Sequence, residues 1–154
     1  MTIRSIMTTN VITVQETAPL SEVARIIVAH HLSGVPVVDD TGRMVGIISE
    51  RDVLREMHPL FYHLMDSPTP NLAHSARDEG FEDISQVKTG SVMTREVQTI
   101  APDTSLMEAA ALMFLWHIRR LPVVEDGQLV GIVSQGDVYQ AIFSMQFPLA
   151  DKDE

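Results

Sequence analysis

The stretch SGVPVVDDTGRMVGIISERDV, residues 33–53, returns in nearly the same form as RRLPVVEDGQLVGIVSQGDV, residues 119–138. The second copy is one residue shorter at Glu125-Asp126-Gly127, a predicted turn, where the loss of a residue disturbs a fold least. The match continues upstream through the pairs Met7/Met93, Thr8/Thr94, Leu20/Leu106 and His31/His117. About 19 of roughly 50 aligned positions are identical, so the chain contains an internal repeat.

Each copy predicts the element order strand, helix, strand, strand, helix, which makes the fold class α+β. Asp126-Gly127 is a strong tight-turn signal because both positions tolerate a positive φ. The predicted elements are short strands at 11–14 and 97–100, helices at 20–32 and 106–118, hairpins at 35–49 and 121–134, and second helices at 50–57 and 135–146.

The repeat divides the chain into a first repeat at 1–57, a linker at 58–89, a second repeat at 90–147 and an acidic tail at 148–154. The linker differs in composition, with three prolines and several charges, and we expect a helical turn around 60–65. Because each repeat is too small to bury a large core alone, we expect the two repeats to share one core.

Composition restricts the class of protein. The 154 residues carry a formal net charge of −10 and no cysteine, which excludes disulfides and thiol chemistry. The negative charge argues against nucleic acid or anionic lipid as a partner, and any phosphate site needs a local group of cations. Since no signal peptide and no membrane-spanning stretch is recognisable, we expect a soluble, cytoplasmic protein.

The pattern Gly-x-x-Ser-x-x-Asp occurs in both copies, as Gly46, Ser49 and Asp52 and again as Gly131, Ser134 and Asp137. Its simplest interpretation is structural, because a serine followed three residues later by a carboxylate caps the N-terminus of a helix. Two copies at equivalent positions, each after a hydrophobic-Pro-Val-Val stretch, are much more specific evidence than a single copy.

With these motifs the sequence resembles the tandem CBS-domain family, the paired modules named after cystathionine β-synthase. The resemblance covers nearly the whole chain outside the linker and the tail. It implies two pseudo-symmetric β-α-β-β-α repeats packed as one Bateman-type module, with two clefts that often hold adenosine-containing ligands. In such a module the aspartates would accept hydrogen bonds from both ribose hydroxyls, and Ser49 and Ser134 would lie near the ribose or the first phosphate.

The resemblance also assigns residues to each cleft by alignment. One cleft would combine Ile12, Leu32 and Ser33 with Ile132, Ser134 and Asp137. The other would combine Gln98, Ile118 and Arg119 with Ile47, Ser49 and Asp52. Pro36 and Pro122, from the repeated hairpins, complete the predicted nucleotide-binding residues.

Phosphate recognition distinguishes the two clefts. Arg120 aligns with a phosphate-binding arginine of the regulatory gamma subunit of AMP-activated protein kinase, whereas the first copy has Gly34 at that position. Arg119 and Arg51 are further candidate cations for the first cleft. We therefore expect the cleft with Ser134 and Asp137 to bind a nucleotide more tightly, and the alternative for Arg119 and Arg120 is a pair of solvated charges.

Other chemistry is weakly supported. The six histidines lack an i, i+4 pair with a carboxylate, so we predict no metal site. No nucleophile with a base and no phosphate loop is recognisable, so we predict no enzyme, with a nucleotide hydrolase as the remaining catalytic alternative.

The resulting hypothesis is a regulatory, energy-sensing module that needs no cofactor and binds AMP, ADP or ATP, with S-adenosylmethionine as a further possible ligand. Apolar residues around most of the helix at 106–118 indicate burial on two sides, which predicts a homodimer face formed with the helix at 20–32. The alternative is a module without ligand that dimerises and regulates a separate enzyme or transporter.

Overall fold

The two repeated hairpins form the centres of two small sheets. In the first copy, β2 (Gly34–Val38) lies between β1 (Val14–Gln15) and β3 (Met44–Ser49). In the second copy, β4 (Arg120–Glu125) pairs antiparallel with β5 (Gln128–Ser134). Asp126 and Gly127 connect β4 to β5 with φ of 51° and 79°, so the predicted tight turn is confirmed.

Equivalent helices precede the two hairpins. The first is α1 (Leu20–His30) and the second is α5 (Leu106–Trp116). His31 and His117 end them in the left-handed conformation, with φ of 53° and 55°. Histidine is among the residues that tolerate this conformation better than most, which explains why the same residue recurs there.

A second pair of helices follows the hairpins, α2 (Glu50–Met57) and α6 (Gln135–Gln146), as the sequence predicts. One predicted strand is wrong: the segment 97–100 forms a single parallel bridge, between Ile100 and Val123, and no strand. The strand predicted at 11–14 is also displaced, because β1 covers only Val14 and Gln15 and pairs parallel with β2.

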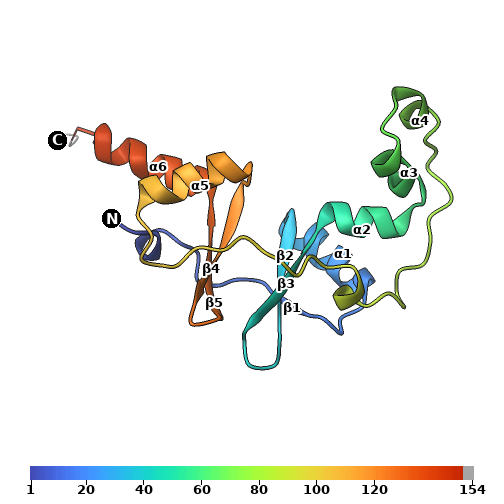
Figure 1. Cartoon of the computed structure of the whole chain (residues 1–154), viewed down its shortest axis with the longest axis horizontal. Helices are drawn as coiled ribbons and strands as arrows, with labels where there is room; N and C mark the ends of the chain where they lie inside the picture. Colours follow the sequence, from blue (N-terminus) through green and yellow to red (C-terminus); the bar gives the residue numbers. More distant parts are fainter. Residues whose placement is uncertain (151–154) are drawn as a thin grey trace. The chain divides into compact units, whose positions relative to one another are not determined.

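The linker contains more helix than its composition suggests. After α2 the chain forms α3 (Leu60–Asp66), which lies at the end of α2, and α4 (Pro70–His74), which lies beyond α3 in Figure 1. The expected helical turn is therefore a helix of two turns followed by another short one. Short 3-10 helices, η1 (Ile3–Ser5) and η2 (Thr89–Ser91), lie at the start of the first and the second repeat.

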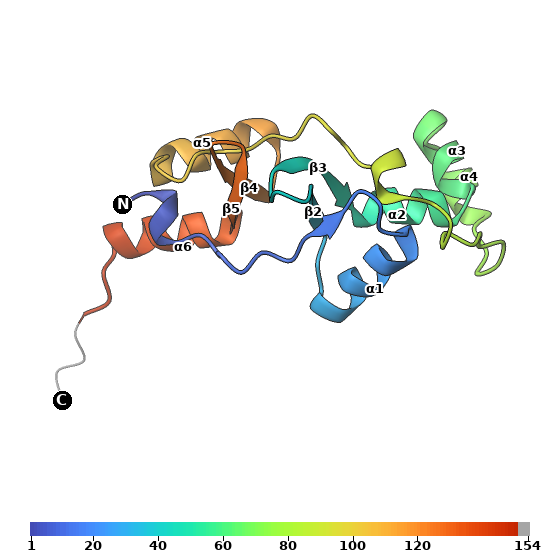
Figure 2. The same cartoon turned by 90° about the horizontal axis from the view of Figure 1, so that it is seen from below.

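The computed structural model describes residues 1–150, and within them the chain forms two compact units. Unit 1 contains the second hairpin with α5 and α6, together with Met1–Val11 and Gly42–Met44. Unit 2 contains Ile12–Thr41 and Val45–Val97. Each unit therefore includes the opening segment of the other unit's repeat, with η1 in unit 1 and η2 in unit 2, as the colours in Figure 2 allow the reader to follow.

Backbone hydrogen bonds hold these leading segments in place. In unit 1, Thr8 and Ile132 form an antiparallel bridge with both N···O distances between 2.8 and 2.9 Å. In unit 2, Thr94 and Ile47 form the same bridge, at 2.9 Å in both directions. The two bridges are equivalent: in each unit, a threonine from the opening segment of one repeat pairs with a strand of the other repeat's hairpin. We call these opening segments the exchanged segments.

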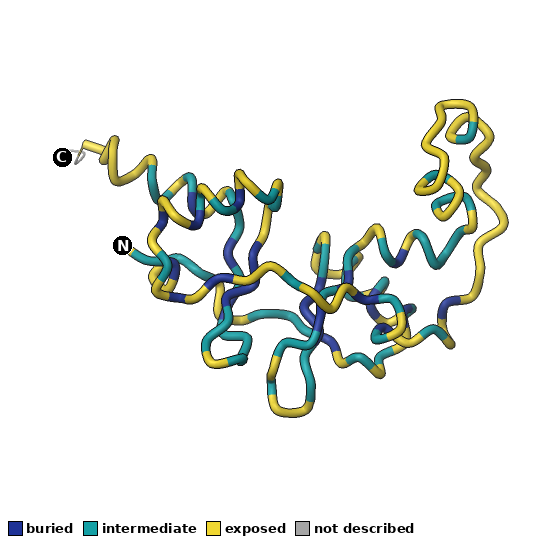
Figure 3. Tube along the Cα trace, in the orientation of Figure 1, coloured by how far each residue is buried: buried dark blue, intermediate teal, exposed yellow. Residues whose placement is uncertain are grey.

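The buried residues form two clusters, one in each unit, and each cluster contains residues of both repeats (Figure 3). The repeats therefore share core residues as expected, but in two clusters among residues 1–150 and not in a single one. Ile3 of the leading segment is fully buried among Leu121, Val133 and the other core residues of unit 1. Met93 contributes in the same way to unit 2. The exchanged segments thus supply part of the apolar surface that a small core needs.

No helix among residues 1–150 is long and apolar enough to cross a membrane. The predicted tail at 148–154 lies mostly outside the described residues, since the description ends at residue 150.

Candidate functional site

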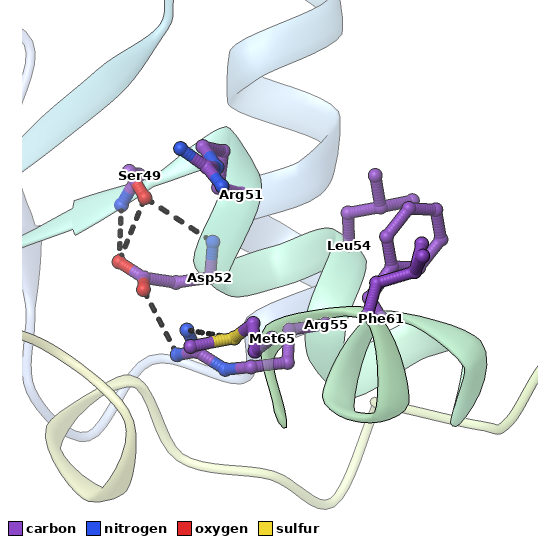
Figure 4. Close-up of a pocket in the computed structure, with 8 residues that line it drawn as sticks. Ser49, Arg51, Asp52, Leu54, Arg55, Phe61 and Met65 are labelled. Carbon is purple, nitrogen blue, oxygen red and sulfur yellow. Dashed lines mark hydrogen bonds and ion pairs between the residues drawn. The ribbon is translucent and has the colours of Figure 1, made fainter. Parts of the chain in front are cut away.

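The first Ser-x-x-Asp motif forms a complete capping box at the N-terminus of α2 (Figure 4). Ser49 Oγ accepts a hydrogen bond from the Asp52 amide at 3.2 Å. Asp52 Oδ2 in turn accepts from the Ser49 amide and the Ser49 hydroxyl, both at 2.9 Å. The capping interpretation of this motif is therefore confirmed, and one carboxylate oxygen of Asp52 is fully engaged in it.

The other oxygen of Asp52 is bound by an arginine from the same helix. Arg55 Nη2 donates to Asp52 Oδ1 at 2.9 Å. Both side chains are mostly shielded from water, with exposed fractions of 19% for Arg55 and 13% for Asp52. A charge-assisted hydrogen bond of this kind is stronger than a neutral one, so Arg55 occupies the face of Asp52 that points away from the cap.

The linker helix α3 packs against the same arginine. Arg55 Nη1 lies 3.7 Å from the sulfur of Met65, and the guanidinium carbon lies 5.8 Å from the centre of the Tyr62 ring. The Tyr62 hydroxyl donates to the Glu56 carboxylate, and this hydrogen bond raises the pKa of Tyr62 above its ordinary value. Helix α3 is thereby joined to α2 through the arginine that covers Asp52.

Between α2 and α3 lies a cavity of about 590 Å³. Ser49, Arg51, Asp52 and Arg55 line its polar side, and Leu54, Phe61, Leu64 and Met65 line its apolar side, as Figure 4 shows for most of them. The volume and the mixture of an apolar wall with a few convergent polar groups are typical of small-molecule sites.

The second motif forms a capping box at the N-terminus of α6, but its carboxylate is more open. Asp137 Oδ2 accepts from the Ser134 amide at 3.2 Å, and Ser134 Oγ accepts from the Asp137 amide at 3.0 Å. Asp137 is exposed, and Gln140 stands where the first repeat has Arg55. Among residues 1–150, Asp137 forms only these capping hydrogen bonds.

Two arginines lie at the end of the unit 1 hairpin where the second motif begins. Arg120 is paired with Ser134 in the β4–β5 ladder, and the Arg119 carbonyl accepts from the Gln135 amide at 2.7 Å. Both arginines are exposed. The backbone of unit 1 therefore places Arg119 and Arg120 at the end of the hairpin next to Ser134, and their role at a phosphate site stays a prediction.

The remaining predicted residues divide between the units. Unit 2 holds Ile12, Leu32, Ser33, Pro36 and Ile47, and unit 1 holds Gln98, Ile118, Pro122 and Ile132. The Ser33 carbonyl accepts from the Glu50 amide at 2.9 Å, so it lies beside the cap of α2 in its own unit. Pro36 and Pro122 are buried within their sheets. The combination of residues from both repeats into common clefts stays a prediction.

Sequence reasoning missed the residues that surround Asp52 from the linker side. The second repeat has Gln140 and no arginine at the position of Arg55. Phe61, Leu64 and Met65 lie in the linker, which the repeat does not cover. The available signal was the spacing, because Asp52 and Arg55 are three residues apart on a predicted helix and such residues are neighbours. Among residues 1–150, no group of three or more His, Cys, Asp or Glu residues could hold a metal ion.

Comparison with known proteins gives the family. The model of the CBS domain matches the chain twice, at residues 3–59 and 89–144. The chain belongs to the CBS-domain family. Its two matches are tandem, and the fold is the α+β arrangement of two CBS repeats that the sequence predicts.

Three relatives of this CBS pair bear on its function. An uncharacterised protein of Methanocaldococcus jannaschii is 35% identical over 154 aligned positions, covering 92% of this chain and 91% of its own. The crystal structure of CBSX2 of Arabidopsis thaliana in complex with AMP has a TM-score of 0.69 at 27% identity, covering 94% of this chain and 98% of that one.

The third relative is an enzyme. The inosine-5′-monophosphate dehydrogenase of Methanocaldococcus jannaschii is 29% identical over 146 aligned positions, which span 94% of this chain and 24% of the enzyme. CBS pairs similar to this chain thus occur both as separate proteins and as parts of enzymes, and at least one of them binds an adenine nucleotide.

Proposed function

We propose that this CBS pair is a regulatory module that binds adenine nucleotides and carries no catalytic activity of its own. The observation that carries the proposal is the open carboxylate of Asp137, held by its capping box beside Arg119 and Arg120. A carboxylate can accept from both hydroxyls of a ribose, and two arginines at the same end of a hairpin provide partners for phosphate. The helix N-terminus behind them favours an anion further.

AMP is the ligand best supported, because CBSX2 is similar to this chain over nearly its whole length and binds AMP. ADP and ATP share the same base, ribose and first phosphate, so they are candidates as well. S-adenosylmethionine shares only the adenosine part and carries no phosphate, so the arginines favour a nucleotide over it. The cytoplasmic location that the composition indicates stays a prediction.

The regulatory output requires a second surface, and we propose that helices α5 and α6 form a homodimer face. Met107 and Phe114 on α5 and Phe143 on α6 are each more than half exposed. They line an apolar groove together with Ala110, Ala111, Tyr139 and Ile142. An exposed apolar patch of this kind marks an interaction surface, and twofold symmetry makes one patch its own partner. The predicted contribution of α1 to this face belongs to the same proposal.

Regulation by a nucleotide then follows from differential affinity. A ligand changes the population of two arrangements only if it binds one of them more tightly. A partner protein that binds only one arrangement of the dimer is then bound to an extent that depends on the nucleotide concentration. The relation to inosine-5′-monophosphate dehydrogenase favours an enzyme as the regulated partner.

Isothermal titration calorimetry and thermal denaturation with AMP, ADP, ATP and S-adenosylmethionine test the proposal. A ligand present at about 100 times its Kd stabilises the folded state by roughly 2.7 kcal/mol, which gives a measurable rise in Tm. Neither heat nor a rise in Tm with any of the four compounds would favour the alternative, a module that dimerises without ligand. Hydrolysis of ATP by the purified protein would contradict the regulatory assignment.

A further inference from the structure

The two aspartates differ in what already binds them. Asp52 accepts three hydrogen bonds, two from Ser49 and one from Arg55, whereas Asp137 accepts one from its cap. A carboxylate has about four acceptor positions, so Asp52 has roughly one left and a ribose diol requires two. A diol and Arg55 therefore compete for Asp52, and no such competition exists at Asp137.

Displacement of Arg55 leaves its guanidinium without its carboxylate. The side chain is four-fifths shielded from water, and an uncompensated charge in such a place is costly. Adenosine is neutral and has no anionic group that could replace the Asp52 carboxylate as the partner of the guanidinium. A phosphate group offers the guanidinium an anionic partner of the bidentate kind that arginine prefers.

We propose that Arg55 makes the site at Asp52 selective for phosphorylated ligands, and that the linker helix α3 responds to their binding. The proposal rests on the function proposed above and adds the specificity of one site. It also gives the first repeat a cation for phosphate besides Arg51, since Gly34 stands where the second repeat has Arg120.

The response of α3 follows from the contacts of the same arginine. Arg55 Nη1 contacts Met65, and the guanidinium lies over the Tyr62 ring. A guanidinium that turns from Asp52 toward a phosphate in the adjoining cavity withdraws from the Tyr62 ring, which does not line that cavity, and moves relative to Met65, which does. Helix α3 has no buried residue, so it is held against α2 by these contacts, by the hydrogen bond from the Tyr62 hydroxyl to Glu56 and by the apolar wall of the cavity. Occupancy of the first site thus weakens the attachment of α3 to α2.

The test isolates the first site by using Asp137→Asn as a background, and compares AMP with adenosine by calorimetry. We expect AMP to bind this protein at least about tenfold more tightly than adenosine, since a charge-assisted hydrogen bond of about 1.5–3 kcal/mol is gained. Adding Arg55→Gln should bring the two affinities to within about twofold, and Arg55→Lys should keep part of the preference because it keeps the charge. Arg25→Gln, an exposed arginine on α1 of the same unit, is the matched control and should keep the full preference.

Amide hydrogen exchange of α3 provides a second readout that does not depend on any substitution of Arg55. AMP should accelerate exchange over residues 60–66 in the background protein, and adenosine should not. An AMP preference that survives Arg55→Gln, or exchange in α3 that AMP does not change, overturns the proposal. If AMP binds the wild type but does not bind the Asp137→Asn background, the first site takes no nucleotide, which overturns this proposal and leaves the proposed function intact. If AMP does not bind the wild type at all, this proposal and the proposed function are both contradicted.

Discussion

At the scale of single residues, the two glycines of the repeated motif have a steric role. A Cβ built on Gly131 would lie 2.7 Å from the sulfur of Met7 and 3.1 Å from the carbonyl oxygen of Thr8. A Cβ on Gly46 would lie 2.7 Å from the sulfur of Met93. The two 2.7 Å distances are too short for a carbon–sulfur contact, so a side chain at either glycine would displace the methionine of the segment that crosses the strand. This contact explains why both repeats contain a Met-Thr pair, Met7-Thr8 and Met93-Thr94, together with a glycine in the motif.

Gly131→Ala should destabilise the protein by about 1–3 kcal/mol, because the added methyl group forces Met7 and the Thr8 backbone away from β5. Urea denaturation measures the change. Gly136→Ala is the matched control, since a Cβ there meets only Ser134 Oγ at 3.7 Å. The control should leave stability unchanged or raise it slightly, as alanine in a helix is favoured over glycine. Equal losses for both variants would contradict the steric role.

Arg120 allows the phosphate part of a ligand to be tested separately from the ribose. Arg120→Ala should weaken the binding of AMP and ATP by about tenfold and leave adenosine nearly unchanged, since only the nucleotides carry a partner for the guanidinium. Calorimetry with the three ligands measures this difference. An equal loss for adenosine would show that Arg120 supports the site structurally and does not contact phosphate.

At the scale of elements, the leading segment η1 is part of a core although it begins at residue 3. Ile3 is fully buried in unit 1, and its amide donates to the Thr104 carbonyl at 2.9 Å. Ile3→Ala should therefore cost about 2–5 kcal/mol of unfolding free energy, the range for truncating a buried aliphatic side chain. Thr9→Ala, at an exposed position six residues further on, should change it little. Urea denaturation of both variants distinguishes a core segment from a loosely attached terminus.

Helices α5 and α6 present the apolar face proposed for the homodimer. Phe114→Glu should dissociate the dimer, because burying a carboxylate without a partner at the centre of an apolar interface is costly. Sedimentation velocity measures the molecular mass, and Ala101→Glu adds the same charge at an exposed position before α5. A wild type that is monomeric at tens of micromolar, or a Phe114→Glu variant that stays dimeric, would contradict the proposed face.

Most elements could be predicted from the sequence because their signals are local. The spacing of apolar residues gave α1 and α5, and the serine caps gave the starts of α2 and α6 to the residue. The segment 97–100 was predicted as a strand from its β-formers, but only Ile100 meets a neighbour. The ion pair between Arg55 and Asp52 was missed because the prediction relied on residues that occur in both repeats, and the second repeat has Gln140 at the position of Arg55.

At the scale of the whole molecule, the organisation into two units could not be predicted from the repeat. The repeat indicates where similar segments lie in the sequence, but not that Met1–Val11 belongs to the unit of the second hairpin. That exchange depends on backbone bridges between residues more than 40 positions apart, such as Ile47 with Thr94, which no local pattern encodes. It gives each unit its own core, and it makes the two repeats interdependent.

The binding of AMP to the wild type and to the Asp137→Asn variant tests the central claim most directly. An amide keeps one acceptor for the Ser134 cap but cannot accept from two ribose hydroxyls as a carboxylate does. Ser105→Ala, which removes a similar serine cap at α5, controls for lost helix stability. We predict that calorimetry finds AMP bound by the wild type, at least about tenfold weaker binding at this site for Asp137→Asn, and unchanged binding for Ser105→Ala. Equal AMP affinity in all three proteins, or no binding to the wild type, would contradict the claim that this carboxylate holds a ribose.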